Sequence, residues 1–126
     1  PKVHRVLDSY DVLGGPHTFT VAWTSKTFRD KNPVLYKAFV AALKEANAIV
    51  NKDKRAAAKL WIERSHSKLP LDMVAKIVSG PQVHWTLTPQ ATMKFANFMA
   101  GVGTLKVKPT SWKDYFFPEV YDLKGS

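Results

Sequence analysis

The spacing of apolar residues changes along this chain, from every second position in some segments to a helical period in others. The clearest alternation lies at 18–25, "TFTVAWTS", where large apolar side chains take one face and threonines the other, a pattern typical of a β-strand. Shorter alternating runs at 3–7, "VHRVL", and at 83–87, "VHWTL", predict two further strands or extended crossings. The apolar face of 18–25 consists of Phe19, Val21 and Trp23.

Between and after these runs the pattern predicts four helices, over about 33–52, 54–64, 71–79 and 89–100. The longest begins with Asn32 as the N-cap and Pro33 in the first helical position, where its missing N–H costs nothing. Its apolar residues recur at the period of a helix that packs along one side. This stripe consists of Leu35, Phe39, Ala42, Leu43, Ala46, Ile49 and Val50.

The other helices also have recognisable starts and apolar faces. Asp53 is the expected N-cap of the second helix, and Thr88-Pro89 repeats the cap-and-proline start at the fourth. In the aromatic tail, Ser111 and Asp114 predict a capping box for one or two further turns. The residues expected to face the core are Ala57, Leu60 and Trp61 in the second helix, Val74, Ile77 and Val78 in the third, and Met93, Phe95, Ala96, Phe98, Met99 and Ala100 in the fourth.

Length and composition favour one folded domain of the helix-rich α/β class. The 126 residues are 45% apolar and 12% aromatic, which excludes a disordered polar chain, and no cysteine is present to form a disulfide or a thiolate nucleophile. Two or three isolated strands cannot make a self-sufficient sheet. The chain also opens inside a strand-like alternation without an initiator Met, so we expect it to be a piece of a longer protein.

The charge is strongly basic and uneven. Lys and Arg number 19 against 10 acids, a net charge of +9, and residues 26–68 hold eleven of the cations with four acids. One interpretation of this stretch is a strip of cations that binds the phosphates of a nucleic acid. We prefer the interpretation that these cations lie on solvated helix faces, because base stacking needs exposed aromatic rings and the nearby aromatics lie on the apolar stripes. The candidate strip consists of Lys52, Lys54, Arg55 and Lys59.

Nothing in the sequence indicates catalysis or a metal. The four histidines are scattered without metal-ligand spacing, and no serine lies in the G-x-S-x-G pattern of a hydrolase. The glycines of "GVGTLK" at 101–106 follow a predicted helix, whereas a phosphate-binding loop lies between a strand and a helix. We therefore expect no cofactor, no metal and no enzyme activity.

Two long runs resemble a known family. They are "TFTVAWTSKTFRDKNPVLYKAFVAALKEANAIVNKDKRAAAKLW" and "VHWTLTPQATMKFANFMAGVGTLKVKPTSWKDYFFPEVYDL". Both are similar to the periplasmic solute-binding proteins of ABC importers in the nitrate/sulfonate/taurine/bicarbonate group, and the order and spacing of the motifs carry the likeness. The matching features are a crossing strand at Thr18–Ser25, a (T/S)-K-x-F step at Ser25–Phe28, the Asn32-Pro33 helix start and a D-x-x-A-A segment from Asp53.

The resemblance implies the C-terminal part of a two-lobe, periplasmic-binding-protein-like (type II) α/β fold. Residues 1–17 would end the second lobe, 18–25 would form the hinge-crossing strand, and 26–126 would be the C-terminal share of the first lobe. In that family a solute is enclosed between the lobes by a hinge motion. The implied ligand-binding residues are Tyr10, His17, Thr18 and Thr20.

The same resemblance implies the partners and the location. The solute would be small and anionic or polar, the protein partner would be the membrane permease of an ABC importer, and the protein would be periplasmic or lipid-anchored outside the cytoplasmic membrane. A homodimer through the exposed edges of an incomplete fold is a further expectation, and binding to nucleic acid is not expected. Two alternatives stay open: an enzyme on the same fold, such as a pyrimidine-precursor synthase for thiamin, and a basic nucleic-acid-binding module.

Overall fold

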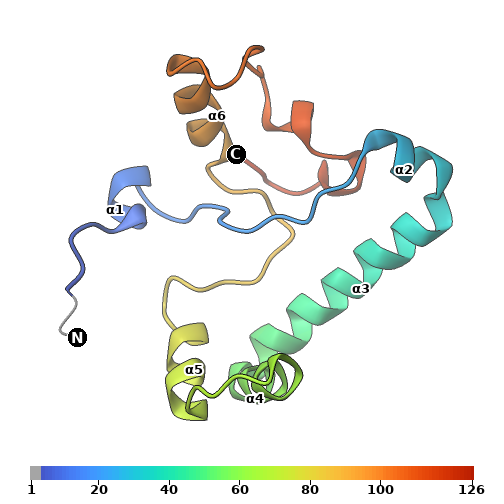
Figure 1. The fold of residues 1–126 in the computed structure, drawn as a ribbon. Helices are drawn as coiled ribbons and strands as arrows, with labels where there is room; N and C mark the ends of the chain where they lie inside the picture. The colour runs from blue at the N-terminus through green and yellow to red at the C-terminus, as the bar shows by residue number, and fades with distance from the viewer. Residues whose placement is uncertain (1–3) are drawn as a thin grey trace. The chain divides into compact units, whose positions relative to one another are not determined.

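The structure is a computed structural model that describes residues 4–126, and all the regular elements in that range are helical (Figure 1). The chain divides into two compact units, which are described separately below. One joins the residues up to Trp23 with Leu87–Ser126, and the other comprises Thr24–Thr86. The helices are α1 (Ser9–Leu13), α2 (Lys26–Lys31), α3 (Pro33–Lys52), α4 (Lys54–Ser65), α5 (Leu71–Val78), α6 (Thr92–Gly101) and the short 3-10 helices η1 (Trp112–Tyr115) and η2 (Pro118–Val120).

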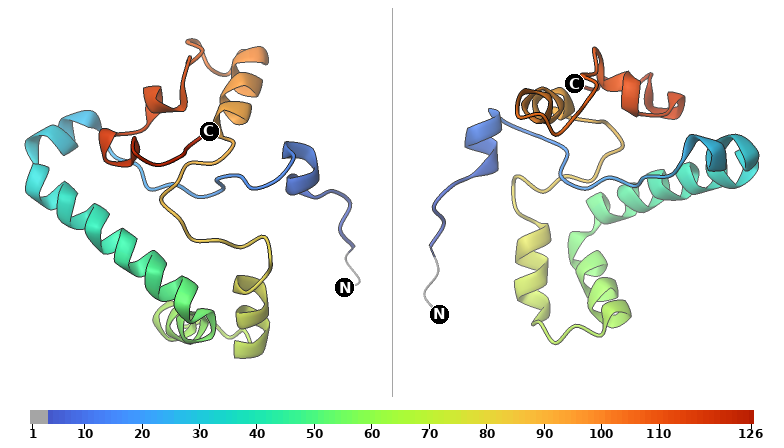
Figure 2. Two further views of the ribbon diagram at one scale, coloured as in Figure 1. Left: turned by 180° about the vertical axis from the view of Figure 1, so that it is seen from behind. Right: turned by 45° about the horizontal axis from the view of Figure 1, so that its top comes forward.

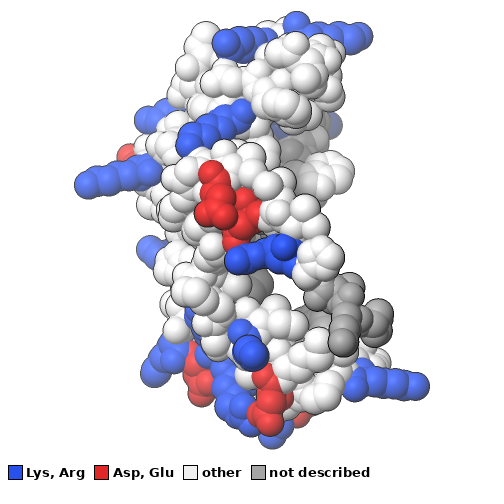
Figure 3. All heavy atoms as spheres, turned by 90° about the vertical axis from the view of Figure 1, so that its left-hand side faces the viewer, with Lys and Arg blue, Asp and Glu red and all other residues white. Residues whose placement is uncertain are grey.

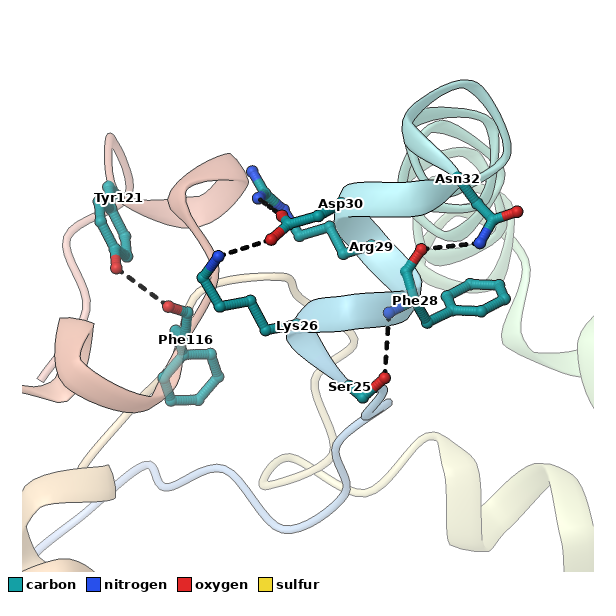
Figure 4. Close-up of polar contacts among 8 residues, drawn as sticks. All are labelled: Ser25, Lys26, Phe28, Arg29, Asp30, Asn32, Phe116 and Tyr121. Atoms are coloured by element: carbon teal, nitrogen blue, oxygen red, sulfur yellow. Dashed lines mark hydrogen bonds and ion pairs between the residues drawn. The ribbon is translucent and has the colours of Figure 1, made fainter.

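The unit 24–86 begins with the short helix α2, whose first turn is capped by Ser25. The Ser25 hydroxyl oxygen accepts a hydrogen bond from the Phe28 N–H at 3.0 Å (Figure 4). Asp30 forms ion pairs with Lys26 at 2.5 Å and with Arg29 at 3.1 Å. These lower the pKa of the Asp30 carboxyl, chiefly because Lys26 donates a hydrogen bond to it.

The core of this unit lies where α4 packs against α5, side by side in both views of Figure 2. Asp53 caps α4, because its Oδ1 accepts from the Ala56 N–H at 2.9 Å. Three residues of the cluster are buried, and three apolar neighbours cover part of it. The buried residues are Ala58, Val74 and Ala75, and the neighbours are Ile62, Leu71 and Val78.

The other unit is held together by bonds between segments that are distant in sequence. The Thr92 N–H and hydroxyl both donate to the Ser126 carbonyl oxygen at 2.7 Å, and the Ser126 N–H donates to the Pro89 carbonyl at 3.0 Å. Trp112 in η1 is buried and meets the Tyr121 ring edge-on at 5.9 Å. The C-terminal segment is thus tied to the start of α6, and its aromatic side chains form a second small core.

The expectation of a helix-rich α/β fold, and with it the C-terminal part of a two-lobe type II binding-protein fold, is wrong. No segment of residues 4–126 pairs into a β-strand, and a type II fragment would need a sheet. Alternation makes a strand only when a neighbouring strand completes its backbone hydrogen bonds. In the segment at 3–7 predicted as a strand, residues 4–7 form no hydrogen-bonded ladder with a neighbouring strand. Val3 lies outside the described residues.

The other two segments predicted as strands form hydrogen bonds with loop and helix residues instead of a neighbouring strand. At 18–25, the Thr18 N–H donates to the Gln90 carbonyl at 2.8 Å, and at its other end the segment leads into the cap of α2. At 83–87, the Asn51 amide donates to the Trp85 carbonyl at 2.6 Å and Lys54 donates to the Val83 carbonyl at 2.9 Å. The Gln90 backbone in one case, and the Asn51 and Lys54 side chains in the other, therefore satisfy backbone groups that a sheet would otherwise pair.

The sequence predicts some features of the helix starts correctly and others wrongly. The start at Pro33 and the Asp53 cap are confirmed, as is the Ser111 capping box. Asn32 does not cap α3 through its side chain, because its amide donates back to the Phe28 carbonyl at 2.8 Å and closes α2, a helix that the sequence patterns did not predict. The fourth helix begins at Thr92 rather than Pro89.

The expected apolar faces are only partly buried. Val74 and Ala96 are buried as predicted, whereas the side chains of Trp61 and Ile77 remain 50% and 56% exposed. In α4 the buried residue is Ala58, because the helix turns this face toward α5. The helix α3 buries no residue at all.

The chain as a whole exposes far more surface than a compact protein of its mass. Its accessible surface is 10139 Å², whereas a folded monomer of 14.2 kDa exposes about 6,800 Å². Large apolar side chains contribute to this exposed surface, such as Phe19 at 92%, Trp23 at 88% and Val34 at 82% exposed.

Candidate functional site

The candidate site lies in the unit that contains α1, and it begins with a tightly capped turn. The Asp8 carboxylate accepts from the Tyr10 N–H at 2.8 Å and pairs with Arg5 at 2.5 Å. Gly14 ends α1 in the left-handed conformation, φ 73°, which places the Gly15 N–H 2.8 Å from the Tyr10 carbonyl. Both ends of α1 are therefore fixed, and Tyr10 lies on a short rigid turn.

His17 follows this turn and meets Tyr10. The two rings are edge-on with centroids 5.1 Å apart, and the Phe95 ring of α6 is 6.1 Å from the imidazole. His17 Nδ1 lies 3.1 Å from the Gly15 carbonyl oxygen, which can only accept, so Nδ1 carries the proton. The other ring nitrogen, Nε2, is then the one that can serve a ligand, as an acceptor when neutral and as a donor when the ring is charged.

Thr18 lies beside this cluster and Thr20 does not join it. The Thr18 backbone N–H donates to the Gln90 carbonyl at 2.8 Å, and its hydroxyl oxygen accepts from the Gln90 N–H at 2.8 Å. This pair of bonds anchors the segment just after His17, and the hydroxyl hydrogen of Thr18 remains able to donate. Thr20 is exposed two residues further along. The structure thus gathers Tyr10, His17 and Thr18, and leaves Thr20 outside.

A lysine from α6 supplies a positive charge at the C-terminal end of this turn. Lys94 Nζ donates to the Leu13 carbonyl, and a Cβ at Gly14 would lie 3.3 Å from that nitrogen. Lys94 and Phe95 were not among the predicted site residues. They are more than 75 positions from His17 in sequence, and no motif links them to it, so only the folded arrangement brings them into view.

The basic strip on α3 and α4 is partly occupied by internal bonds. Lys54 donates to the Val83 carbonyl at 2.9 Å, and Arg55 lies 2.8 Å from Asp72. Figure 3 shows carboxylates among the Lys and Arg side chains of the drawn face. This mixed distribution is typical of solvated helix faces rather than of a phosphate-binding strip.

The described residues offer no metal centre and no membrane span. No group of three or more His, Asp or Glu side chains within residues 4–126 is placed to hold a metal ion. None of the helices in that range combines the length and the apolar character that crossing a bilayer requires.

No protein-family model matches the chain, and neither a curated protein nor a solved structure shows significant similarity to it.

Proposed function

We propose that this chain belongs to the substrate-binding component of an ABC importer and takes part in capturing a small anionic or polar solute. The observation that carries the proposal is the gathering of Tyr10, His17 and Thr18 around the capped turn of α1. Three of the four residues that the family resemblance implies lie together there, although they come from a helix, a loop and an extended segment.

The chemistry of this cluster suits an oxyanion with a small organic body. A charged imidazole donates a strong, short hydrogen bond to an oxyanion through Nε2. The Tyr10 and Phe95 rings lie near the imidazole and offer apolar surface to the rest of the solute. The net charge of +9 raises the local concentration of anions around the protein.

The proposal also assigns the partner and the location. A captured solute would pass to the membrane permease of the importer, and the protein would act outside the cytoplasmic membrane. The sheet-based cleft between two lobes is not part of this proposal, because the described residues contain no sheet.

Isothermal titration calorimetry with nitrate, bicarbonate, taurine and a short alkanesulfonate tests the proposal. We expect at least one of them to bind and His17→Ala to weaken that binding at least tenfold, which corresponds to about 1.4 kcal/mol. The matched control is His84→Ala, an exposed histidine in the other unit, which should bind like the unchanged protein. Absence of binding for all four solutes, or equal binding by both variants, would contradict the proposal.

A further inference from the structure

The helix α3 carries a bare apolar seam. The residues of this seam recur at alternating spacings of four and three, which is the heptad pattern of a helix that pairs with another helix. The exposed fractions are 58% at Leu35, 49% at Phe39 and 59% at Ile49, and the two alanines between the large residues are exposed as well. The α3 seam consists of Leu35, Phe39, Ala42, Ala46 and Ile49.

The neighbouring face of α3 behaves differently. Its residues are half-buried, which leaves the seam as the more exposed apolar face of the helix. That half-buried face consists of Tyr36, Val40, Leu43, Asn47 and Val50. A row of large apolar side chains along a helix of 20 residues, about 30 Å long, is an uncommon surface for a monomer.

We infer that the α3 seam pairs with the α3 seam of a second copy of this chain, in an antiparallel arrangement. The seam residues occupy the two core positions of the heptad, called a and d. In an antiparallel pair, each a position of one helix faces a d position of the other helix. One register then sets Leu35 against Ala46 of the second copy and Phe39 against Ala42. Every large side chain in these four layers meets a small one, which is the complementarity that lets two helices interdigitate.

The charges of α3 are compatible with this pairing. Lys37 and Lys44 lie on the side of the helix opposite the seam, so the lysines of two paired helices point away from each other. Glu45 flanks the seam at its middle and would lie near Ala38 of the second copy, not near another carboxylate. The remaining opposition is long-range repulsion between two chains of net charge +9, which salt screens.

The size of the contact sets the strength of the dimer. In the stated register about 24 Å of each helix overlaps, which buries less than the roughly 1,200–2,000 Å² of stable complexes. We therefore expect a weak dimer with a dissociation constant on the order of 100 µM, tighter at high salt than at low salt. A complex driven by charge would show the reverse salt dependence.

Sedimentation equilibrium of the 126-residue chain, from about 10 µM to about 1 mM, tests the inference. The variant Ala46→Glu puts a charge in the seam and should raise the dissociation constant at least tenfold. Ala48→Glu makes the same change on another exposed face of α3 and should leave the dimer unchanged. Circular dichroism checks that both variants keep their helix. A chain that stays monomeric throughout, or that dimerises equally in both variants, overturns the inference and leaves the seam to a different polypeptide segment.

Cysteine cross-linking tests the antiparallel register separately. The chain has no native cysteine, so each introduced thiol is unique. A mixture of Leu35→Cys and Ala46→Cys should form a disulfide-linked heterodimer under mild oxidation, because the register brings these positions within bonding distance. Leu35→Cys alone should cross-link at least tenfold more slowly. Preferential linking of Leu35→Cys to itself would indicate a parallel pair and contradict the register.

Discussion

Gly125 lies so close to the face of Trp112 that no larger residue fits there. A Cβ at Gly125 would be 2.7 Å and 2.8 Å from two atoms of the Trp112 ring, which real contacts do not reach. Since Trp112 is buried and Ser126 is bonded to Pro89 and Thr92, neither side can move away without breaking the small aromatic core.

We therefore expect Gly125→Ala to destabilise the unit that contains α6 by about 1–3 kcal/mol, the usual cost of overpacking. Urea unfolding followed by tryptophan fluorescence measures the change. The matched control is Gly101→Ala, where a Cβ would meet nothing within 4 Å and stability should not fall. Equal stability of the two variants would show that the tail does not hold Trp112 as described.

Asp114 gives the tail a dependence on pH. Its carboxylate accepts hydrogen bonds from the N–H groups of Ser111 and Thr110 and from the Thr110 hydroxyl, and these lower its pKa, the Ser111 bond most of all. A depressed pKa contributes stability above the unfolded value of about 3.9, and this contribution is lost as the pH falls through the folded value.

The variant Asp114→Asn should accordingly be less stable than the parent chain at pH 7. Below about pH 4 the difference should shrink, because the parent carboxyl becomes protonated and loses the same bonds. Thermal unfolding of both chains across this pH range measures the effect. A difference that stays constant down to the lowest pH would contradict the assigned hydrogen bonds.

The residues of the candidate site were predictable only in part. The family resemblance named Tyr10, His17 and Thr18, which lie on either side of a Gly-Gly-Pro turn in the sequence. Thr20 was named on the same ground, yet it lies outside the cluster because the extended segment carries it past the Gln90 anchor. Contacts from α6 depend on tertiary folding, which local patterns do not encode.

At the scale of elements, the helix starts were predictable where one residue decides the local geometry. Asp53 caps α4 because a carboxylate before a helix satisfies the first free N–H groups, whatever the rest of the chain does. Asn32 could serve either the helix before it or the helix after it. In the structure it serves α2, because both its backbone N–H, at 3.0 Å, and its side-chain amide, at 2.8 Å, donate to the Phe28 carbonyl. Strands depend on distant partners, so the alternation at 18–25 could not establish a sheet.

The Asp53 cap gives a prediction for α4. We expect Asp53→Ala to lower the free energy of unfolding of the unit 24–86 by about 1 kcal/mol, because the Ala56 N–H loses its acceptor. Asp53→Asn keeps an acceptor at the same position and should lower the free energy of unfolding by about a few tenths of a kcal/mol at most. Chemical unfolding followed by circular dichroism compares the three chains, and an equal loss in both variants would exclude the cap as the cause.

At the scale of the whole molecule, the folded chain already exposes much of its surface, which limits how much additional surface unfolding can expose. An unfolded chain of 14.2 kDa exposes about 20,600 Å², so unfolding this structure exposes about 10,500 Å² more, against about 13,800 Å² for a compact protein of equal mass. The urea m-value follows that difference.

We expect an m-value about a quarter below that of a compact protein of this length, measured in dilute solution where α3 seams do not pair. A protein of known compact structure and similar length serves as the reference in the same buffer. An m-value equal to the reference would mean that the apolar residues described as exposed are buried in solution.

The central claim is that the turn carrying Tyr10, His17 and Thr18 binds a small oxyanion. Nuclear magnetic resonance of the His17 imidazole nitrogens during titration with the solute that binds in calorimetry tests it most directly. We expect the Nε2 signal to shift in a saturable way while the Nδ1 proton stays bonded to the Gly15 carbonyl. A saturable shift at His84 with none at His17 would contradict it.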